Sequence, residues 1–152
     1  MTYINELIRM LDDCEFCPFE IIENQCLCVY EGFCLIYPKK PIFKYHFILF
    51  PIQHDQMFHK INNFFEIKDF TNKIFSAFNK IDADCGYNIF SNNGSKAGQS
   101  GTHAHIHIFI RLSDEEKSPY DLLNNSSLRQ EMNREEWVEN RDRFRKMFVV
   151  KD

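Results

Sequence analysis

The strongest constraint on this chain is a run of alternating histidines. His103, His105 and His107 are each separated by one apolar residue in the segment HAHIHIFI, residues 103–110. Strict alternation in a run rich in isoleucine predicts a strand. Since successive side chains of a strand point to opposite faces, the three imidazoles should line one face and the intervening apolar side chains the other. The segment therefore predicts a sheet with one reactive face and one face buried in the core.

A glycine-rich loop directly precedes this strand. Residues 92–101 read NNGSKAGQSG, small and polar residues that allow backbone N–H groups to approach an anion. A single such loop, or a single histidine, would be weak evidence. Three imidazoles at two-residue spacing are harder to explain as packing, because each would need its own hydrogen-bond partner if buried. Loop and strand together predict a phosphate-sized cleft facing a row of imidazoles.

These two segments carry a family resemblance. The run Gly98-Gln99-Ser100, followed by His-x-His-x-His, resembles the signature of the histidine triad (HIT) family of nucleotide hydrolases and transferases, and residues 92–97 resemble its bacterial zinc-containing branch. The resemblance extends from about residue 14 to residue 111. It implies an α+β, HIT-like fold with a five-stranded, mainly antiparallel sheet, one long helix packed on it and a helical C-terminal extension. It also implies a homodimer joined through that helix and a sheet edge.

Periodicity in the rest of the chain fits such a fold. We predict strands over 26–30, 33–37, 45–51 and 86–91, with Glu31-Gly32 as a hairpin turn. Helical spacing predicts short helices over 2–11 and 121–123 and longer ones over 64–81 and 135–149. In the helix over 64–81, one face carries Phe64, Ile67, Phe70, Ile74, Phe78 and Ile81. We divide the chain into a HIT domain, 1–112, and a C-terminal extension, 113–152, which docks on the same domain or on the dimer partner.

A possible metal site begins at the motif Cys14-x-x-Cys17. Two thiols at this spacing fit a tetrahedral metal, redox chemistry or unmetallated turn cysteines. The family resemblance implies that His54 and His103 complete a Cys2His2 set. Such a closed set suits a structural zinc, which stabilises the fold without activating water. Cys26, Cys28 and Cys34 lie inside predicted strands and are interpreted as core thiols.

The resemblance also implies catalytic roles. His105 becomes the nucleophile that attacks the α-phosphorus of a nucleotide, and a neutral imidazole, with a pKa of about 6.5, suits that task. A backbone carbonyl near His107 would fix its tautomer. Around the phosphate, His107, Asn92 and the amides of Gly98 to Gly101 would bind oxygens, Ser100 and Gln99 would contact or protonate the leaving group, and His46 would orient the triad or contact the nucleotide.

One position departs from the family pattern. Many relatives carry an aspartate that binds the ribose hydroxyls, whereas this chain has Pro38 at the corresponding place, with Lys39, Lys40 and Lys44 nearby. These lysines either form a solvated basic loop or steer a polyphosphate tail.

The leading hypothesis is a hydrolase of nucleoside phosphoramidates, adenylates or dinucleoside polyphosphates that acts through a nucleotidyl-histidine. One alternative is a nucleotidyl transferase or phosphorylase, in which phosphate or a sugar phosphate opens the intermediate. Another is a zinc-stabilised nucleotide-binding regulatory domain with little turnover. A His-x-His pair could also hold a catalytic zinc, but the triad strand has no acid for the surrounding shell.

Composition bounds the remaining options. The 152 residues suffice for one domain, and a net charge of −4 without a basic block predicts no nucleic-acid surface. The N-terminus lacks a signal-peptide pattern, and no apolar run approaches the ~18 residues of a membrane span. We therefore expect a soluble, cytoplasmic protein whose six cysteines are reduced or metal-bound, with disulfides as the alternative.

Overall fold

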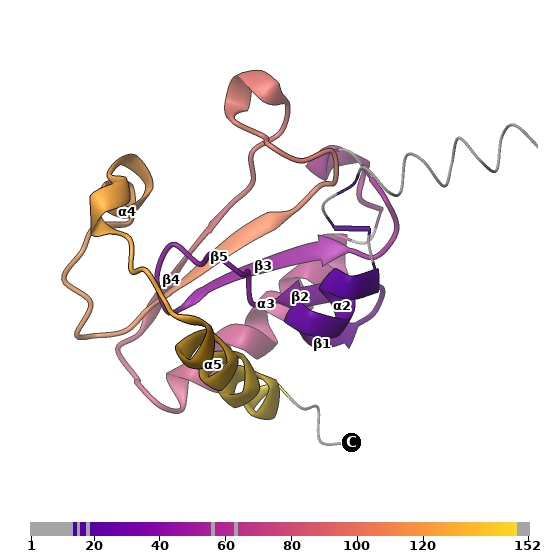
Figure 1. Ribbon diagram of the computed structural model, residues 1–152. Coiled ribbons are helices and arrows are strands. Elements are labelled where there is room, and N and C mark those ends of the chain that lie inside the picture. The colour runs from indigo at the N-terminus through magenta and orange to yellow at the C-terminus, as the bar shows by residue number, and fades with distance from the viewer. Residues whose placement is uncertain (1–13, 15, 18, 56, 63, 149–152) are drawn as a thin grey trace, which may run out of the picture.

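The computed structural model describes residues 14, 16–17, 19–55, 57–62 and 64–148. Five antiparallel strands form one sheet in the order β1-β2-β3-β5-β4 (Figure 1). The strands are β1 (Cys26–Tyr30), β2 (Phe33–Ile36), β3 (His46–Pro51), β4 (Gly86–Phe90) and β5 (Ile106–Arg111). This confirms the α+β fold with a five-stranded, antiparallel sheet that the sequence predicts. The predicted helix over 2–11 lies outside the described residues.

The first hairpin shows how local sequence fixes register. Glu31 and Gly32 both have positive φ, 47° and 80°, as a two-residue hairpin turn of type I′ requires. The turn places Tyr30 opposite Phe33 and Val29 opposite Cys34, and an irregularity follows between Cys26 and Cys28. The structure therefore confirms the predicted hairpin turn at Glu31-Gly32.

Helix α3 (Phe64–Asn79) covers one face of the sheet. Its buried side chains, at helical spacing, pack against apolar side chains that alternate along β3 and β5. Ile81 was predicted to belong to this stripe, but the helix ends at Asn79 and Ile81 is 68% exposed. The contacting side chains include Ile67, Phe70, Ile74 and Phe78 from the helix, and Phe47, Leu49, Ile106, Ile108 and Ile110 from the sheet.

The opposite face of the sheet carries the reactive side chains. His46, Ile48 and Phe50 alternate with the core residues of β3, and Ile48 lies opposite His107 in the register. Helix α2 (Phe19–Gln25) contacts β1 and β2, and its Ile21 joins Phe16 over this face. The sequence analysis did not predict α2. It brings the N-terminal cysteine segment over the sheet.

The C-terminal extension packs on the same chain. Helix α5 (Arg134–Met147) lies below the sheet in Figure 1 and contacts β1, while α4 (Pro119–Asn124) projects to the left. Trp137 stacks on Tyr37, with ring centroids 5.9 Å apart, and Phe144 lies 4.9 Å from Phe47. The extension thus completes the core around α3. Whether 1–112 and 113–152 form separate units stays a prediction. None of the described helices is both long and apolar enough to cross a membrane.

Candidate functional site

The triad strand begins later than predicted. The β5 ladder starts at Ile106, so His103 and His105 lie in the irregular segment before it and only His107 lies within the strand. The reason is that His103 and its neighbour take other partners: Ala104 N donates to Asp55 O at 2.6 Å, and the His103 ring meets Pro51 O. Consequently, the side chains of His103 and His105 do not belong to one regular strand face.

His103 turns toward the N-terminal cysteines. Its ring is fully buried, and its Nε2–H donates to Pro51 O at 2.6 Å, because a carbonyl can only accept. The proton on Nε2 leaves a lone pair on Nδ1, which faces the Sγ atoms of Cys14 at 3.4 Å and Cys17 at 3.5 Å. The backbone of β3 thus fixes the tautomer that a metal ligand needs.

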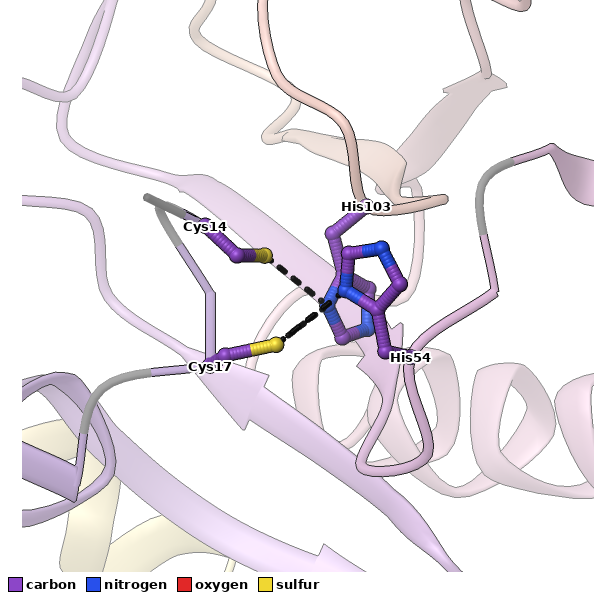
Figure 2. A group of neighbouring side chains, drawn as sticks. All are labelled: Cys14, Cys17, His54 and His103. Carbon is purple, nitrogen blue, oxygen red and sulfur yellow. Dashed lines mark hydrogen bonds between the residues drawn. The ribbon is translucent and has the colours of Figure 1, made fainter. Parts of the chain in front are cut away.

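Four side chains converge here from three segments of the chain (Figure 2). The donor atoms of Cys14, Cys17, His54 and His103 all lie within 4.8 Å of one another, and His54 Nδ1 lies 3.1 Å from Cys17 Sγ. Zinc bonds of about 2.0–2.3 Å place the donors of a tetrahedral ion roughly 3.3–3.8 Å apart, close to the shorter distances here. Burial and the neighbouring Cys14 raise the pKa of Cys17 to about 12, which disfavours its thiolate form. A bound cation would stabilise that thiolate. The four residues fit a structural zinc.

His105 stays outside this ligand set. Its Nδ1–H donates to the backbone carbonyl of His103 at 2.9 Å. The carbonyl that fixes its tautomer therefore belongs to His103, two residues before it, and not to a residue near His107 as the family analogy suggested. Nε2 keeps its lone pair and makes no hydrogen bond to any described residue. The ring is 5% exposed, with the ring of Phe16 4.9 Å away on one side and that of His107 at the same distance on another.

A relay of hydrogen bonds fixes His107 in the tautomer opposite to that of His105, with its proton on Nε2. Ile42 N donates to His46 Nδ1 at 3.0 Å, so the proton of a neutral His46 lies on Nε2. That Nε2–H donates to His107 Nδ1 at 2.9 Å, which places the proton of His107 on its Nε2. His105 therefore presents a lone pair, while its neighbour His107 presents a donor. Both ring nitrogens of His46 are engaged within the protein.

Electrostatics favours neutral rings in this relay. Burial, with His107 and His105 nearby, holds the pKa of His46 well below its usual value. Burial and the neighbouring His105 likewise lower the pKa of His107 to about 4. At neutral pH both imidazoles are uncharged, which keeps the direction of the relay defined.

A cavity of about 480 Å³ opens beside the relay. His46 and His107 line one end, and apolar side chains from α2, β2 and β3 line the walls. Gln25 also lines the cavity and is 7% exposed, and its Oε1 accepts a hydrogen bond from Lys39 N at 3.1 Å. We did not predict roles for Phe16 or Gln25 from the sequence, since no motif marks them. Only the tertiary contacts place them here.

No described hydrogen bond joins the glycine-rich loop to the triad imidazoles. The loop projects at the top of Figure 1 between β4 and β5 and closes on itself, with Gly94 N donating to Gln99 Oε1 at 2.7 Å and Gln99 N to Gly94 O at 3.1 Å. Gly98 has a φ of 86°, and a Cβ there would meet Asn92 at 3.9 Å. Ser100 is exposed, and no described hydrogen bond joins it to the triad.

A family model identifies this architecture. The model for the HIT domain matches residues 22–114, which is more than half of the chain. This chain belongs to the HIT-domain family. The matched segment of the HIT domain includes the triad and His54 but begins after the two cysteines.

Solved structures share this HIT fold. A zinc-bound histidine triad family protein from Mycobacterium smegmatis is 21% identical, with a TM-score of 0.67 and 90% and 94% of the two chains covered. A hypothetical histidine triad nucleotide-binding protein from Sulfolobus tokodaii is 20% identical, with a TM-score of 0.66 and coverage of 88% and 91%. Diadenosine triphosphate hydrolase from Plasmodium falciparum is 18% identical, with a TM-score of 0.54 and coverage of 68% and 72%. A search of curated protein sequences finds no significant match.

Proposed function

We propose that this HIT protein is a nucleotide hydrolase that acts at the α-phosphate through a covalent nucleotidyl-His105. The observation that carries the proposal is the opposite polarity of two adjacent rings: Nε2 of His105 has a free lone pair, and Nε2 of His107 carries a proton. A nucleophile beside a hydrogen-bond donor suits attack on phosphorus, where negative charge grows on the oxygens in the transition state.

The reaction divides into two displacements. The lone pair of His105 Nε2 forms a bond to the α-phosphorus while the bond to the leaving group breaks, and the leaving group takes up a proton. Water then attacks the same phosphorus, releases the nucleoside monophosphate and returns the electron pair to His105. His107 donates to a phosphate oxygen in both steps, and His46 holds it in position. We assign Asn92, Gly98, Gln99 and Ser100 to the phosphate and leaving-group side, which requires the loop to close over the substrate.

The cavity beside His46 and His107 suits the nucleoside. Its volume of about 480 Å³ is within the usual range for small-molecule sites, and its apolar walls suit a base. The amide of Gln25 provides hydrogen-bond donors near the place where relatives carry the ribose-binding aspartate. We infer that the substrates are nucleoside phosphoramidates, adenylates or dinucleoside polyphosphates.

Zinc supplies structural support in this proposal. Cys14, Cys17, His54 and His103 would hold the ion and tie the N-terminal segment to the exit of β3 and to the segment before β5. A closed set of four protein ligands leaves no position for a catalytic water.

A homodimer is the second part of the proposal. Among the described strands β4 is an edge strand, and its Tyr87 and Ile89 are 46% and 42% exposed. They border a hollow of about 610 Å³ with Ile67 and Phe75 of α3, and Phe65 of the same helix is 84% exposed. An apolar helix face next to an open sheet edge suits a second copy of the chain, whose β4 would extend the sheet.

Trapping the intermediate tests the catalytic proposal. The protein is mixed with a dinucleoside polyphosphate or an aminoacyl-adenylate analogue and quenched with denaturant at alkaline pH, because the P–N bond of a nucleotidyl-histidine is labile in acid, and its intact mass is measured. We expect a mass increase of one nucleotidyl group in the native protein and in the control His59→Asn, which changes an exposed histidine outside the site. His105→Asn should show neither the adduct nor turnover. Undiminished turnover by His105→Asn would reject the nucleophile, and product analysis with added phosphate identifies the acceptor.

A further inference from the structure

A second cavity shares Lys39 with the nucleoside cavity. It has a volume of about 490 Å³ and lies between helix α5 and the segment that follows β2. Three of its lining side chains are basic, Lys39, Arg134 and Arg141, and none is acidic. A hollow lined by several cations and no carboxylate favours an anionic ligand.

The wall between the two cavities is the backbone at Pro38 and Lys39, and it is held from both sides. On the α5 side, Trp137 Nε1–H donates to Pro38 O at 2.8 Å. On the nucleoside side, Lys39 N donates to Gln25 Oε1 at 3.1 Å. Lys39 lines both cavities, so this residue belongs to the surface that the two share.

The three cations differ in how much of their charge is already neutralised. Arg141 pairs with Asp142 at 3.0 Å, donates to Asn24 O and lies 5.2 Å over the Trp137 ring, so it is anchored. Arg134 and Lys39 are exposed, and neither has an ion-pair partner among the described residues. A planar guanidinium and a flexible ammonium facing one space suit a phosphate group.

This chain has Pro38, followed directly by Lys39, at the place where many relatives carry an aspartate that binds ribose hydroxyls. An acidic residue beside a ribose favours free hydroxyls, whereas a basic residue at such a place accommodates a phosphate on the ribose, as dinucleotide-binding proteins illustrate. Lys39 therefore marks the boundary at which a ribose phosphate would leave the nucleoside cavity and enter the basic one.

We propose that the second cavity binds a phosphate carried on the 2′- or 3′-oxygen of the nucleotide's ribose, so that the preferred substrates are nucleotides phosphorylated on the ribose. The inference rests on the proposed function, because that function places the nucleoside in the first cavity. Gln25, on the nucleoside side of the wall, and Arg134, on the α5 side, hold the two ends of this ligand.

Direct binding measurements on the full-length protein test the inference. Dissociation constants are measured by calorimetry for adenosine 5′-monophosphate, adenosine 2′,5′-bisphosphate and adenosine 3′,5′-bisphosphate. One bisphosphate should bind about tenfold or more tightly than the monophosphate, as expected for charge-assisted hydrogen bonds to one phosphate. Comparison of the 2′ and 3′ arms shows which oxygen carries the group.

Paired variants locate the phosphate. Arg134→Gln should reduce the ratio of the two dissociation constants toward one, and Lys39→Gln should do the same. Arg143→Gln changes an exposed arginine of the same helix outside the cavity and should keep the native ratio. Equal affinity for monophosphate and bisphosphates, or a ratio unchanged in Arg134→Gln and Lys39→Gln, would overturn the inference and leave the proposed function standing. Failure of every nucleotide to bind would overturn both.

Discussion

The Nδ1–H of His105 donates to the backbone carbonyl of His103, whose own side chain faces Cys14 and Cys17. One residue therefore serves two sites: its ring faces the proposed metal, and its carbonyl orients the proposed nucleophile. Phe16 strengthens the link, because its ring lies 4.9 Å from that of His105 and belongs to the same turn as the cysteines. Loss of the metal should consequently affect catalysis as well as stability.

Zinc removal should lower thermal stability. A ligand present at 1,000 times its Kd stabilises the folded state by about 4 kcal/mol, which corresponds to roughly 8–16 °C in Tm for a domain of this size. We expect a chelator to lower the Tm of the native protein by this amount, measured by calorimetry. Cys17→Ser should start from the lower Tm and show no response to the chelator.

The matched control is Cys28→Ser, which changes a half-buried thiol of β1 outside the cluster. Its Tm should still fall on chelation, even though the substitution itself costs some stability. An identical chelator response in Cys17→Ser and Cys28→Ser would contradict the assigned ligand set.

Chelation should also affect catalysis. In the chelated native protein, kcat should fall more than KM rises, because the carbonyl that orients His105 is displaced.

His46 should act as a positioning residue. It contacts His107 and Ile42 N with its two nitrogens, so its effect on substrate passes through the tautomer of His107. We expect His46→Leu to reduce kcat about 100-fold or more with little change in KM, as for other groups that fix a catalytic tautomer. His46→Gln retains an amide N–H that can reach His107 Nδ1 and should recover part of the loss. Equal kcat in the two variants would show that packing alone matters.

Much of this architecture was predictable because its signals are local. The Glu31-Gly32 turn and the apolar stripe of α3 depend on residues next to one another in sequence, and both are found. The start of β5 was wrong because Ala104 and His103 are held by Asp55 and Pro51, about fifty residues earlier in the chain. No local pattern contains such contacts.

In the candidate site, too, the features marked by local sequence were predictable and those that depend on distant contacts were not. Its histidines and cysteines were marked by spacing and family resemblance, whereas the tautomers depend on single backbone groups such as Ile42 N and Pro51 O. The basic cavity was not foreseen, since Trp137 and Arg134 follow Lys39 by about a hundred residues and meet it only because α5 packs beside β1. Individual basic residues far apart in sequence give no sign of a shared pocket.

Dimerisation through β4 should be sensitive to charge. Ile89 is exposed on the edge strand, and a charged side chain in an apolar interface carries a desolvation cost. We expect Ile89→Lys to convert a dimer into a monomer in sedimentation velocity experiments. Val29→Lys makes the same change in charge on β1, at the opposite edge of the sheet, where the native residue is 50% exposed, and should leave the dimer intact. A native protein that sediments as a monomer would contradict the proposed assembly.

Acid should destabilise the protein through the imidazole relay. The pKa of His107 is about 4 in the folded protein, against about 6.5 for an unfolded chain, so the unfolded state binds the proton first as pH falls. The contribution of the neutral His107 ring to the free energy of unfolding is complete above pH 6.5 and is lost as the pH falls from about 6.5 to 4. A shift of this size, discounted for partial exposure of the ring, corresponds to about 2–3 kcal/mol. Urea unfolding at pH 7.5 and 4.5 measures this contribution as the loss of unfolding free energy.

In His107→Asn the loss of unfolding free energy should be smaller by this amount, because asparagine does not titrate. His59→Asn changes an exposed histidine outside the relay and should keep the native pH dependence. Equal losses in native protein and His107→Asn would mean that the relay accepts a proton at the pH of an ordinary histidine, and the fixed polarity of His105 and His107 would then be lost under mildly acidic conditions.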